Sequence, residues 1–248
     1  MGRTERRHGL SKALLGLPQA FSNLPDHARQ KLAESATVRT FARNEVVIPP
    51  GQLSPPVVAL RSGLLVLSFT GDVEGGIASD FVRPLDVFSG STRLRIFSSG
   101  TLSAVSASAA VLWPVEAFRE ALLSSADFAV WYLDGLERRL AHHYLHRARV
   151  VHLSGEAQYA YFLWAMSEPT TDGRRLMKVK IPQQLVASYL GVGREEVSRR
   201  KTLLEKTGHI SQTSAGLELM DSIVHLFSLE DAGSRMPGEL PFVTGLDA

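Results

Sequence analysis

The stretch IPQQLVASYLGVGREEVSRRKTLLEKTGHISQTSAGLELMD, residues 181–221, decides the fold because it holds two helical patterns joined by glycines. Apolar residues recur at helical spacing after Pro182, which suits the first turn of a helix. Gly191-Val192-Gly193 then interrupts the pattern. A second helix is predicted from Arg194 to about Lys206, and Gly208 supplies its stop signal. Together these signals predict a helix-turn-helix.

A β-hairpin is predicted directly after the second helix. His209-Ile210-Ser211 and Leu217-Glu218-Leu219 have the composition of two short strands, and the polar segment 212–216 between them suits a turn. A hairpin in this place is the "wing" of a winged helix, which is more specific than a helix-turn-helix pattern alone.

Positive charge is concentrated in this part of the chain. Between Arg174 and Ile210 there are nine Lys and Arg residues and three acidic residues, whereas the whole chain has a formal charge of only +2. Neutralising DNA phosphates requires such a local excess. The competing interpretation is a surface helix laced with ion pairs.

Four polar residues lie in the N-terminal half of the second helix, where a recognition helix contacts base edges. They are Arg194, Glu195, Ser198 and Arg199. Arginine can bond bidentately to guanine, glutamate can accept from cytosine, and serine can bond a base or a phosphate. We predict that these four read bases, and that Gln183, Arg200, Lys201 and Lys206 contact phosphates.

The run LGVGREEVSRRKTLLEKTGHI resembles the DNA-binding domain of the Crp/Fnr family of bacterial transcription regulators, whose recognition helix carries a similar Arg-Glu-x-x-Ser-Arg pattern. The resemblance implies a homodimer that reads a palindromic DNA site and, for an activator, contacts RNA polymerase. One departure is Arg200 and Lys201, because the family usually has apolar residues there. Either their stems snorkel over the core or the helix is rotated.

The composition is that of an ordinary soluble protein with room for two domains: 248 residues, 44% hydrophobic and 21% charged. Cysteine is absent, which excludes disulfides, thiolate metal sites and cysteine nucleophiles. No apolar run is long enough for a membrane span, and Leu14 to Leu17 is too brief for a signal-peptide core. We expect a cytoplasmic protein with no membrane partner.

The segment from Thr37 to Pro114 has the texture of a small all-β barrel or roll, after two short helices expected at 10–21 and 25–35. Short β-rich pieces alternate with glycine and proline turns; they are 45–48, 57–60, 64–69, 77–82 and 110–113. FARNEVVIPPG, LRSGLLVL and PLDVFSG resemble successive turns of the cyclic-nucleotide-binding β-roll of the same family, and AVLWPVEAFREALL resembles the strand and helix that end it.

The resemblance also places an effector pocket, at Gly90, Ser91, Thr101 and Leu102. Family members that bind a cyclic nucleotide carry a Gly-Glu pair for the ribose and an Arg-Ser pair for the phosphate. The acid and the arginine are missing here, so an effector other than cyclic AMP, or none, is expected. Between Phe41 and Glu120 there is no His or Cys, so we expect neither a histidine-held metal nor another cofactor in the roll.

The longest helical pattern runs from Asp127 to about Leu153. Residues recur on it at coiled-coil spacing; they are Leu133, Leu136, Leu140, Tyr144, Arg147 and Val151. Two copies could bury this seam against each other, or one copy could lay it on the roll. If this is a generic amphipathic helix, burial of the seam on the roll is slightly favoured. If the chain carries a DNA-binding module that reads palindromic sites, burial of the seam against a second copy is favoured.

Three histidines, His142, His143 and His146, lie on the same helix. Two of them are spaced for metal chelation on one face, but no glutamate or third ligand accompanies them. We therefore interpret them as a solvated polar face.

The fold class predicted is α+β, with an N-terminal β-roll (jelly-roll-like) sensor, a long dimerisation helix and a C-terminal winged helix-turn-helix. The expected divisions are an arm at 1–20, the roll at 21–124, the helix and hinge at 125–153, the DNA-binding domain at 154–229 and a tail at 230–248. A DNA-binding regulator is the leading hypothesis. A ligand-sensing roll with weakened or lost DNA binding is the alternative. An enzyme is not expected, because no nucleophile–base pair, metal set or phosphate loop is found.

Overall fold

The computed structural model describes residues 17–69, 76–89, 100–172 and 174–227. The chain divides into two compact units, Met1–Ala141 and His142–Ala248, and the boundary falls within one long helix. The arm expected at 1–20 falls mostly outside the described residues, and the tail expected at 230–248 lies wholly outside them. No helix in the described ranges has the length and apolarity needed to cross a membrane.

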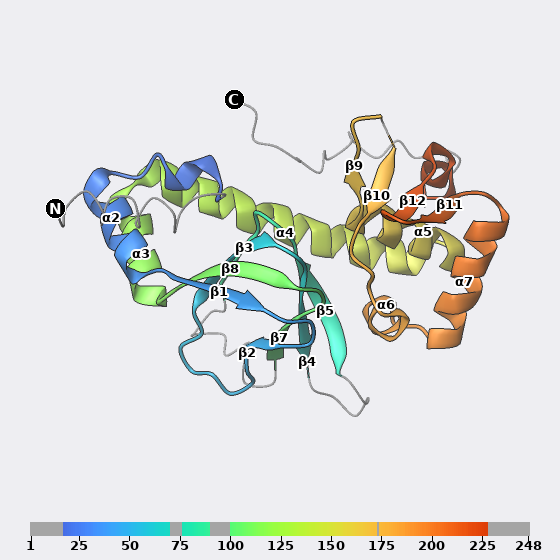
Figure 1. Ribbon diagram of the computed structural model, residues 1–248, viewed down its shortest axis with the longest axis horizontal. Helices are drawn as coiled ribbons and strands as arrows, with labels where there is room; N and C mark the ends of the chain where they lie inside the picture. The colour runs from blue at the N-terminus through green and yellow to red at the C-terminus, as the bar shows by residue number, and fades with distance from the viewer. Residues whose placement is uncertain (1–16, 70–75, 90–99, 173, 228–248) are drawn as a thin grey trace. The chain divides into compact units, whose positions relative to one another are not determined.

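The first unit contains a β-roll made of two antiparallel four-stranded sheets (Figure 1). One sheet has the order β1-β8-β3-β6 and the other the order β2-β7-β4-β5. The strands are β1 (Thr37–Phe41), β2 (Val46–Ile48), β3 (Val57–Ser62), β4 (Leu65–Phe69), β5 (Ile77–Val82), β6 (Val87–Ser89), β7 (Gly100–Ala104) and β8 (Ser108–Trp113). The predicted β-roll is therefore confirmed.

The connection between β3 and β4 requires a glycine for two reasons. Gly63 has φ +90°, a conformation that side chains rarely adopt. A Cβ atom there would also lie 2.5 Å from the carbonyl oxygen of Ala107 and 2.7 Å from Cα of Ser108. Gly63 thus lets the chain cross from one sheet to the other against the β7–β8 turn.

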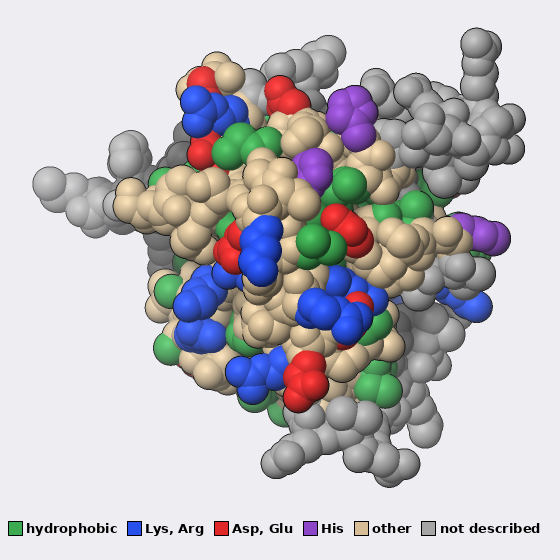
Figure 2. All heavy atoms as spheres, turned by 90° about the vertical axis from the view of Figure 1, so that its right-hand side faces the viewer, with side chains coloured by type: hydrophobic (Ala, Val, Ile, Leu, Met, Phe, Trp, Pro, Cys, Tyr) green, Lys and Arg blue, Asp and Glu red, His purple; other side chains and the backbone are tan. Residues whose placement is uncertain are grey.

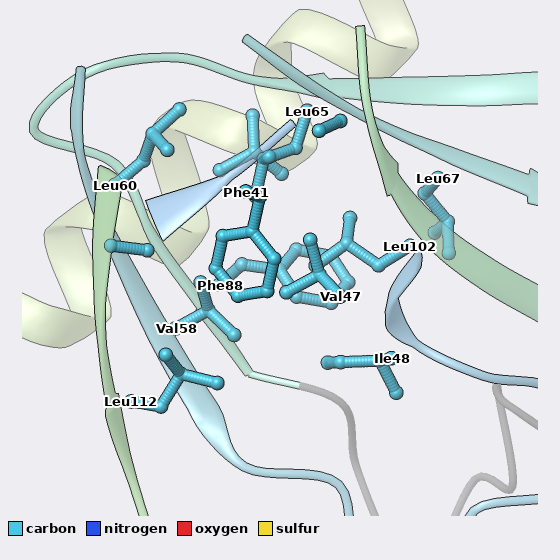
Figure 3. Close-up of a cluster of buried hydrophobic side chains, with 13 residues drawn as sticks. Phe41, Val47, Ile48, Val58, Leu60, Leu65, Leu67, Phe88, Leu102 and Leu112 are labelled. Carbon is cyan, nitrogen blue, oxygen red and sulfur yellow. The ribbon is translucent and has the colours of Figure 1, made fainter. Parts of the chain in front are cut away.

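Apolar side chains from both sheets fill the interior of the roll (Figure 3). Phe41, Leu60, Leu65 and Leu102 are at most 2% exposed, and Phe88 lies among them. The alternation of buried and half-buried positions along β7 shows how a two-residue period turns one side of each strand inward.

A second core joins the N-terminal helices to the outer face of the β1-β8-β3-β6 sheet. It contains η1 (Gln19–Phe21), α2 (Asp26–Ser35), α3 (Val115–Ser124) and the start of α4 (Ala126–His152). Phe21 stacks on Trp113 with ring centroids 5.4 Å apart, and the Trp113 indole donates a hydrogen bond of 2.9 Å to the Leu32 carbonyl. In the part of the chain that the structure describes, η1 and α2 therefore pack on the outer face of this sheet.

One buried ion pair connects α4 to the roll. Asp80 on β5 is 7% exposed, and its carboxylate lies 3.0 Å from Nε of Arg139. The guanidinium of Arg139 also lies over the ring of Phe88, 5.1 Å from its centroid. Because Asp80 is removed from water, the cation from α4 offsets much of the cost of burying it.

The second unit is a winged helix. After α5 (Gly155–Met166) come β9 (Glu168–Pro169), β10 (Arg175–Met177), α6 (Gln183–Leu190), α7 (Arg194–Lys206), β11 (Ile210–Thr213), β12 (Gly216–Leu219) and η3 (Asp221–Leu226). Its sheet has the order β11-β12-β10-β9, so the predicted wing hairpin is confirmed. Strand β10 has only three residues, and η3 is a 3-10 helix.

The core of the second unit is built around α5. Seven of its residues are buried, among them Tyr159, Phe162 and Leu163. Burial and the charge of Glu205 raise the pKa of Tyr159 above its usual range, so its phenol stays neutral. Tyr159, Phe162 and Leu163 are therefore part of the core of the second unit. Trp164 is half-buried and faces the guanidinium of Arg175 at 4.4 Å.

Replacing Arg139 by Met should destabilise the first unit by about 3 kcal/mol, because buried Asp80 would lose its 3.0 Å ion pair with the guanidinium. Urea unfolding at constant pH measures this. The double variant Asp80→Asn/Arg139→Met is the control and should recover part of the loss. An unchanged midpoint for Arg139→Met would show that the pair does not stabilise the roll.

Candidate nucleic-acid interface

The turn between α6 and α7 sets the direction of the second helix. Gly191 ends α6 in the left-handed conformation, with φ 68°, and the amide of Val192 donates to the Ala187 carbonyl at 3.0 Å. Gly193 then precedes α7, whose first turn carries Glu195 and Glu196. Acidic side chains at this end interact favourably with the helix dipole.

The two sides of α7 differ sharply in exposure. Val197, Arg200 and Leu204 are buried, and they lie on one side because they are spaced three and four residues apart. Arg194, Glu195, Ser198 and Arg199 are exposed. The structure therefore brings the four predicted base-reading residues together on the outer side of α7, and their contact with bases stays a prediction.

The residues predicted to contact phosphates do not share one environment. Gln183 is the first residue of α6 and is half-buried, whereas Lys206, in the last turn of α7, is exposed. Lys201 is half-buried and its amine lies 3.3 Å from the carboxylate of Glu205. Arg200 is only 9% exposed, so the phosphate contact predicted for it is wrong.

Arg200 packs inside the second unit, against the first residue of α5. A Cβ atom on Gly155 would lie 2.6 Å from Cζ and 2.8 Å from Nε of Arg200. Gly155 is therefore a glycine for reasons of space. The Nε of Arg200 donates to Oε1 of Glu196 at 2.8 Å, an i,i+4 pair within α7. At residue 200 the guanidinium therefore lies inside the unit beside Glu196 and does not snorkel to the surface.

Glu196 bonds a second arginine through its other oxygen. Oε2 accepts from Nη2 of Arg199, whose side chain is 77% exposed. The hydrogen bonds from Arg199 and Arg200 hold the pKa of Glu196 below its usual value. Neither Glu196 nor Gly155 was among the predicted site residues. The i,i+4 spacing of Glu196 and Arg200 was an available signal, and Gly155 gave none.

Acidic partners neutralise several of the basic residues counted in this segment. Arg174 bonds Glu218 at 2.6 Å, and Lys178 lies 3.0 Å from Glu168. In the described ranges, Lys180, Arg194 and Lys206 form no ion pair. Figure 2 looks onto the side of Figure 1 that carries α7 and shows Lys and Arg side chains there with Asp and Glu among them. Positive charge is thus present but interrupted.

The histidines at the end of α4 contact α6. The ring of His146 stacks on Tyr189 with centroids 4.5 Å apart, and Nε2 of His142 lies 3.5 Å from the Tyr189 hydroxyl. All three histidines are half-buried. The interpretation of a solvated polar face is therefore wrong for His142 and His146, because packing against Tyr189 occupies them.

The predicted seam on α4 is exposed. Leu133, Leu136 and Leu140 are 55%, 39% and 51% exposed, and Val130 extends the stripe at 55%. The face that packs on the first unit's second core instead carries Phe128. These leucines therefore do not lie on the roll. Tyr144 and Arg147 are also exposed, and the side chain of Val151 lies outside the described residues.

The predicted effector pocket is only partly described. Gly90 and Ser91 lie outside the described residues, and Thr101 is half-buried. Leu102 is fully buried among Phe41, Leu65 and Phe88. The expectation that Leu102 lines a pocket is therefore wrong, because its side chain is part of the apolar core.

No protein-family model and no curated protein matches the chain. Solved structures do. FixK2 from Bradyrhizobium japonicum is 18% identical, with a TM-score of 0.64 over 78% of this chain and 98% of that one. TTHA1359, a transcriptional regulator of the CRP/FNR family from Thermus thermophilus, is 18% identical, with a TM-score of 0.60 over 77% and 97%.

A cyclic nucleotide-binding domain containing protein from Listeria monocytogenes is 16% identical, with a TM-score of 0.62 over 85% of this chain and 97% of that one. At these identities the similarity establishes the fold alone. The chain has the fold of the Crp/Fnr regulators, a β-roll of the cyclic-nucleotide-binding type followed by a winged helix-turn-helix.

Replacing Gly155 by Ala should destabilise the second unit by about 1–3 kcal/mol, because the new methyl group would overlap the guanidinium of Arg200. In an Arg200→Ala background the same change should cost little, since alanine is a better helix former than glycine. Urea unfolding of the four proteins measures the coupling. Equal costs in both backgrounds would contradict the steric account.

Proposed function

We propose that this chain is a sequence-specific, DNA-binding transcription regulator of the Crp/Fnr family. The observation that carries the proposal is the outer side of α7, where Arg194, Glu195, Ser198 and Arg199 are exposed together in a winged helix-turn-helix. Their donors and acceptors match base edges in a major groove. The resemblance of the Arg-Glu-x-x-Ser-Arg pattern and the shared fold both support the same function.

The proposed regulator acts as a homodimer on a palindromic site. The exposed stripe of Val130, Leu133, Leu136 and Leu140 supports this, because leucines at coiled-coil spacing favour burial against a second copy. Two-fold symmetry would place two recognition helices about one DNA turn apart. As an activator, the dimer would also contact RNA polymerase. We place the protein in the cytoplasm and assign it no enzymatic activity.

The proposed effector is not cyclic AMP. An anionic ring phosphate needs a fixed cation and hydrogen-bond donors, and the positions matching the family's pattern lack both the acid and the arginine. The apolar filling around Leu102 also supports a signal of other chemistry, or none, and we propose no cofactor.

A second candidate is a ligand-sensing roll whose DNA binding is weakened or lost. The burial of Arg200 and the ion pairs of Arg174, Lys178 and Lys201 favour it, because each reduces the charge available to phosphates. Selection of bound sequences from a random DNA pool separates the two candidates. A two-fold symmetric consensus supports the regulator, and recovery of no consensus supports the sensor.

Arg199→Ala should weaken binding to the selected duplex by about 1–3 kcal/mol and change binding to random DNA little, because a bidentate base contact is lost. Fluorescence polarisation at two salt concentrations measures both affinities. Arg43→Ala, an exposed arginine in the first unit, is the matched control. An equal fall on both duplexes would assign Arg199 to the phosphates instead.

Leu140→Glu should convert the dimer to a monomer at micromolar concentration, since it places two charges in the apolar stripe. Sedimentation velocity measures the mass. Leu53→Glu is the control, because Leu53 is 83% exposed on the roll and lies off the stripe. If the wild-type chain sediments as a monomer, the stripe has another role.

A further inference from the structure

Glu196 lies between one buried and one exposed arginine. Its Oε1 accepts from Nε of Arg200 at 2.8 Å, and its Oε2 accepts from Nη2 of Arg199. The side chains of Arg200 and Arg199 are 10% and 77% exposed. One carboxylate therefore links an arginine that DNA cannot reach to one in the candidate base-reading set.

Packing holds the side chain of Arg200, the buried arginine of this pair, in place. Gly155 leaves no room for even a methyl group between the start of α5 and the guanidinium of Arg200. In the described residues, Nη1 of Arg200 is buried without a hydrogen-bond partner, so Glu196 is the group that compensates this cation. A buried arginine with one anionic partner holds that partner strongly, because leaving it unpaired is costly.

The carboxylate of Glu196 also restricts the rotamers of Arg199, the exposed arginine. A free arginine side chain carries about 2 kcal/mol of rotamer entropy, which a base contact must overcome. A bond from Nη2 to a fixed Oε2 removes part of that freedom before DNA arrives, and the guanidinium keeps other N–H donors for a base. The carboxylate also opposes nonspecific attraction of phosphates to this part of α7.

We infer that Arg200 and Glu196 are positioning residues for base recognition: Arg200 holds Glu196, and Glu196 orients Arg199. Residue 200 thus determines sequence specificity without touching DNA. This inference rests on the proposed function and deepens it, because it assigns the discrimination of one base pair to a contact inside the protein.

The first experiment needs no DNA. Carboxyl carbon NMR follows the titration of Glu196 in the wild-type protein and in Arg200→Met. Methionine is apolar and of similar length, and the carboxylate of Glu196, whose side chain is 28% exposed, keeps its hydrogen bond from Arg199 in this variant. We expect the wild-type pKa to lie below its usual value of 4.5 and to rise in the variant, which loses one donor to the carboxylate. Identical titrations in both proteins would overturn the inference.

The second experiment measures discrimination on DNA. The ratio of affinities for the selected duplex and for single base-pair variants is compared between the wild type and Arg200→Met. We expect the ratio to fall roughly tenfold at the one base pair that Arg199→Ala identifies, within the range for a bidentate contact. Arg200→Lys, which keeps one charged donor, should retain more of the ratio than Arg200→Met. Leu204→Met is the packing control and should leave the ratio unchanged.

A double-mutant cycle tests the route through the carboxylate. Arg200→Met should have no further effect on the ratio in a Glu196→Gln background, because the link is already broken. An independent, additive effect would overturn the inference. If the wild type selects a consensus and Arg200→Met keeps its full discrimination, the inference alone fails. If the wild type selects no consensus, the proposed function fails and the inference fails with it.

Discussion

The arrangement of the second unit depends on how α7 divides its surface between core and solvent. Val197 and Leu204 bury one side of the helix, and the residue between them on that side is an arginine. Burying a guanidinium is tolerable only with an anion and with space, which Glu196 and Gly155 supply. Because Arg200 packs inward, the opposite side of α7, which carries Arg194 and Ser198, stays exposed.

The structure of the first unit depends on a different constraint, the closure of two sheets around an apolar interior. Side chains such as Phe41, Phe88 and Leu102 fill the space between the sheets, and the aromatic cluster around Trp113 covers one of them from outside. Asp80 and Ser108 are buried polar residues of this region, and Arg139 of α4 compensates the charge of Asp80. The helix that carries the exposed leucine stripe is therefore held to the roll by a charge and by aromatic packing, so its leucines are left for another surface.

Local patterns predicted much of this architecture. Glycines around Val192 and the stop signal at Gly208 define the helix-turn-helix, because few other residues adopt the left-handed conformation found at Gly191. Short β-rich pieces separated by glycine and proline turns predicted the roll. The predictions that were wrong concern contacts between residues distant in sequence. The sequence pattern did not show that Tyr189 packs beside the histidines of α4, or that Leu102 lies in the apolar core.

The sequence by itself determined the order of elements and the residues on the outer side of α7, because both follow from short-range periodicity and turn chemistry. Only the tertiary structure decided what Arg200 does. Its positive charge, in a segment rich in Lys and Arg, predicts a phosphate contact. In the structure Arg200 instead packs inward against Gly155 and pairs with Glu196. The residue type determines that Arg200 is charged, but whether its guanidinium faces solvent or the protein interior depends on the neighbours that the fold places beside it.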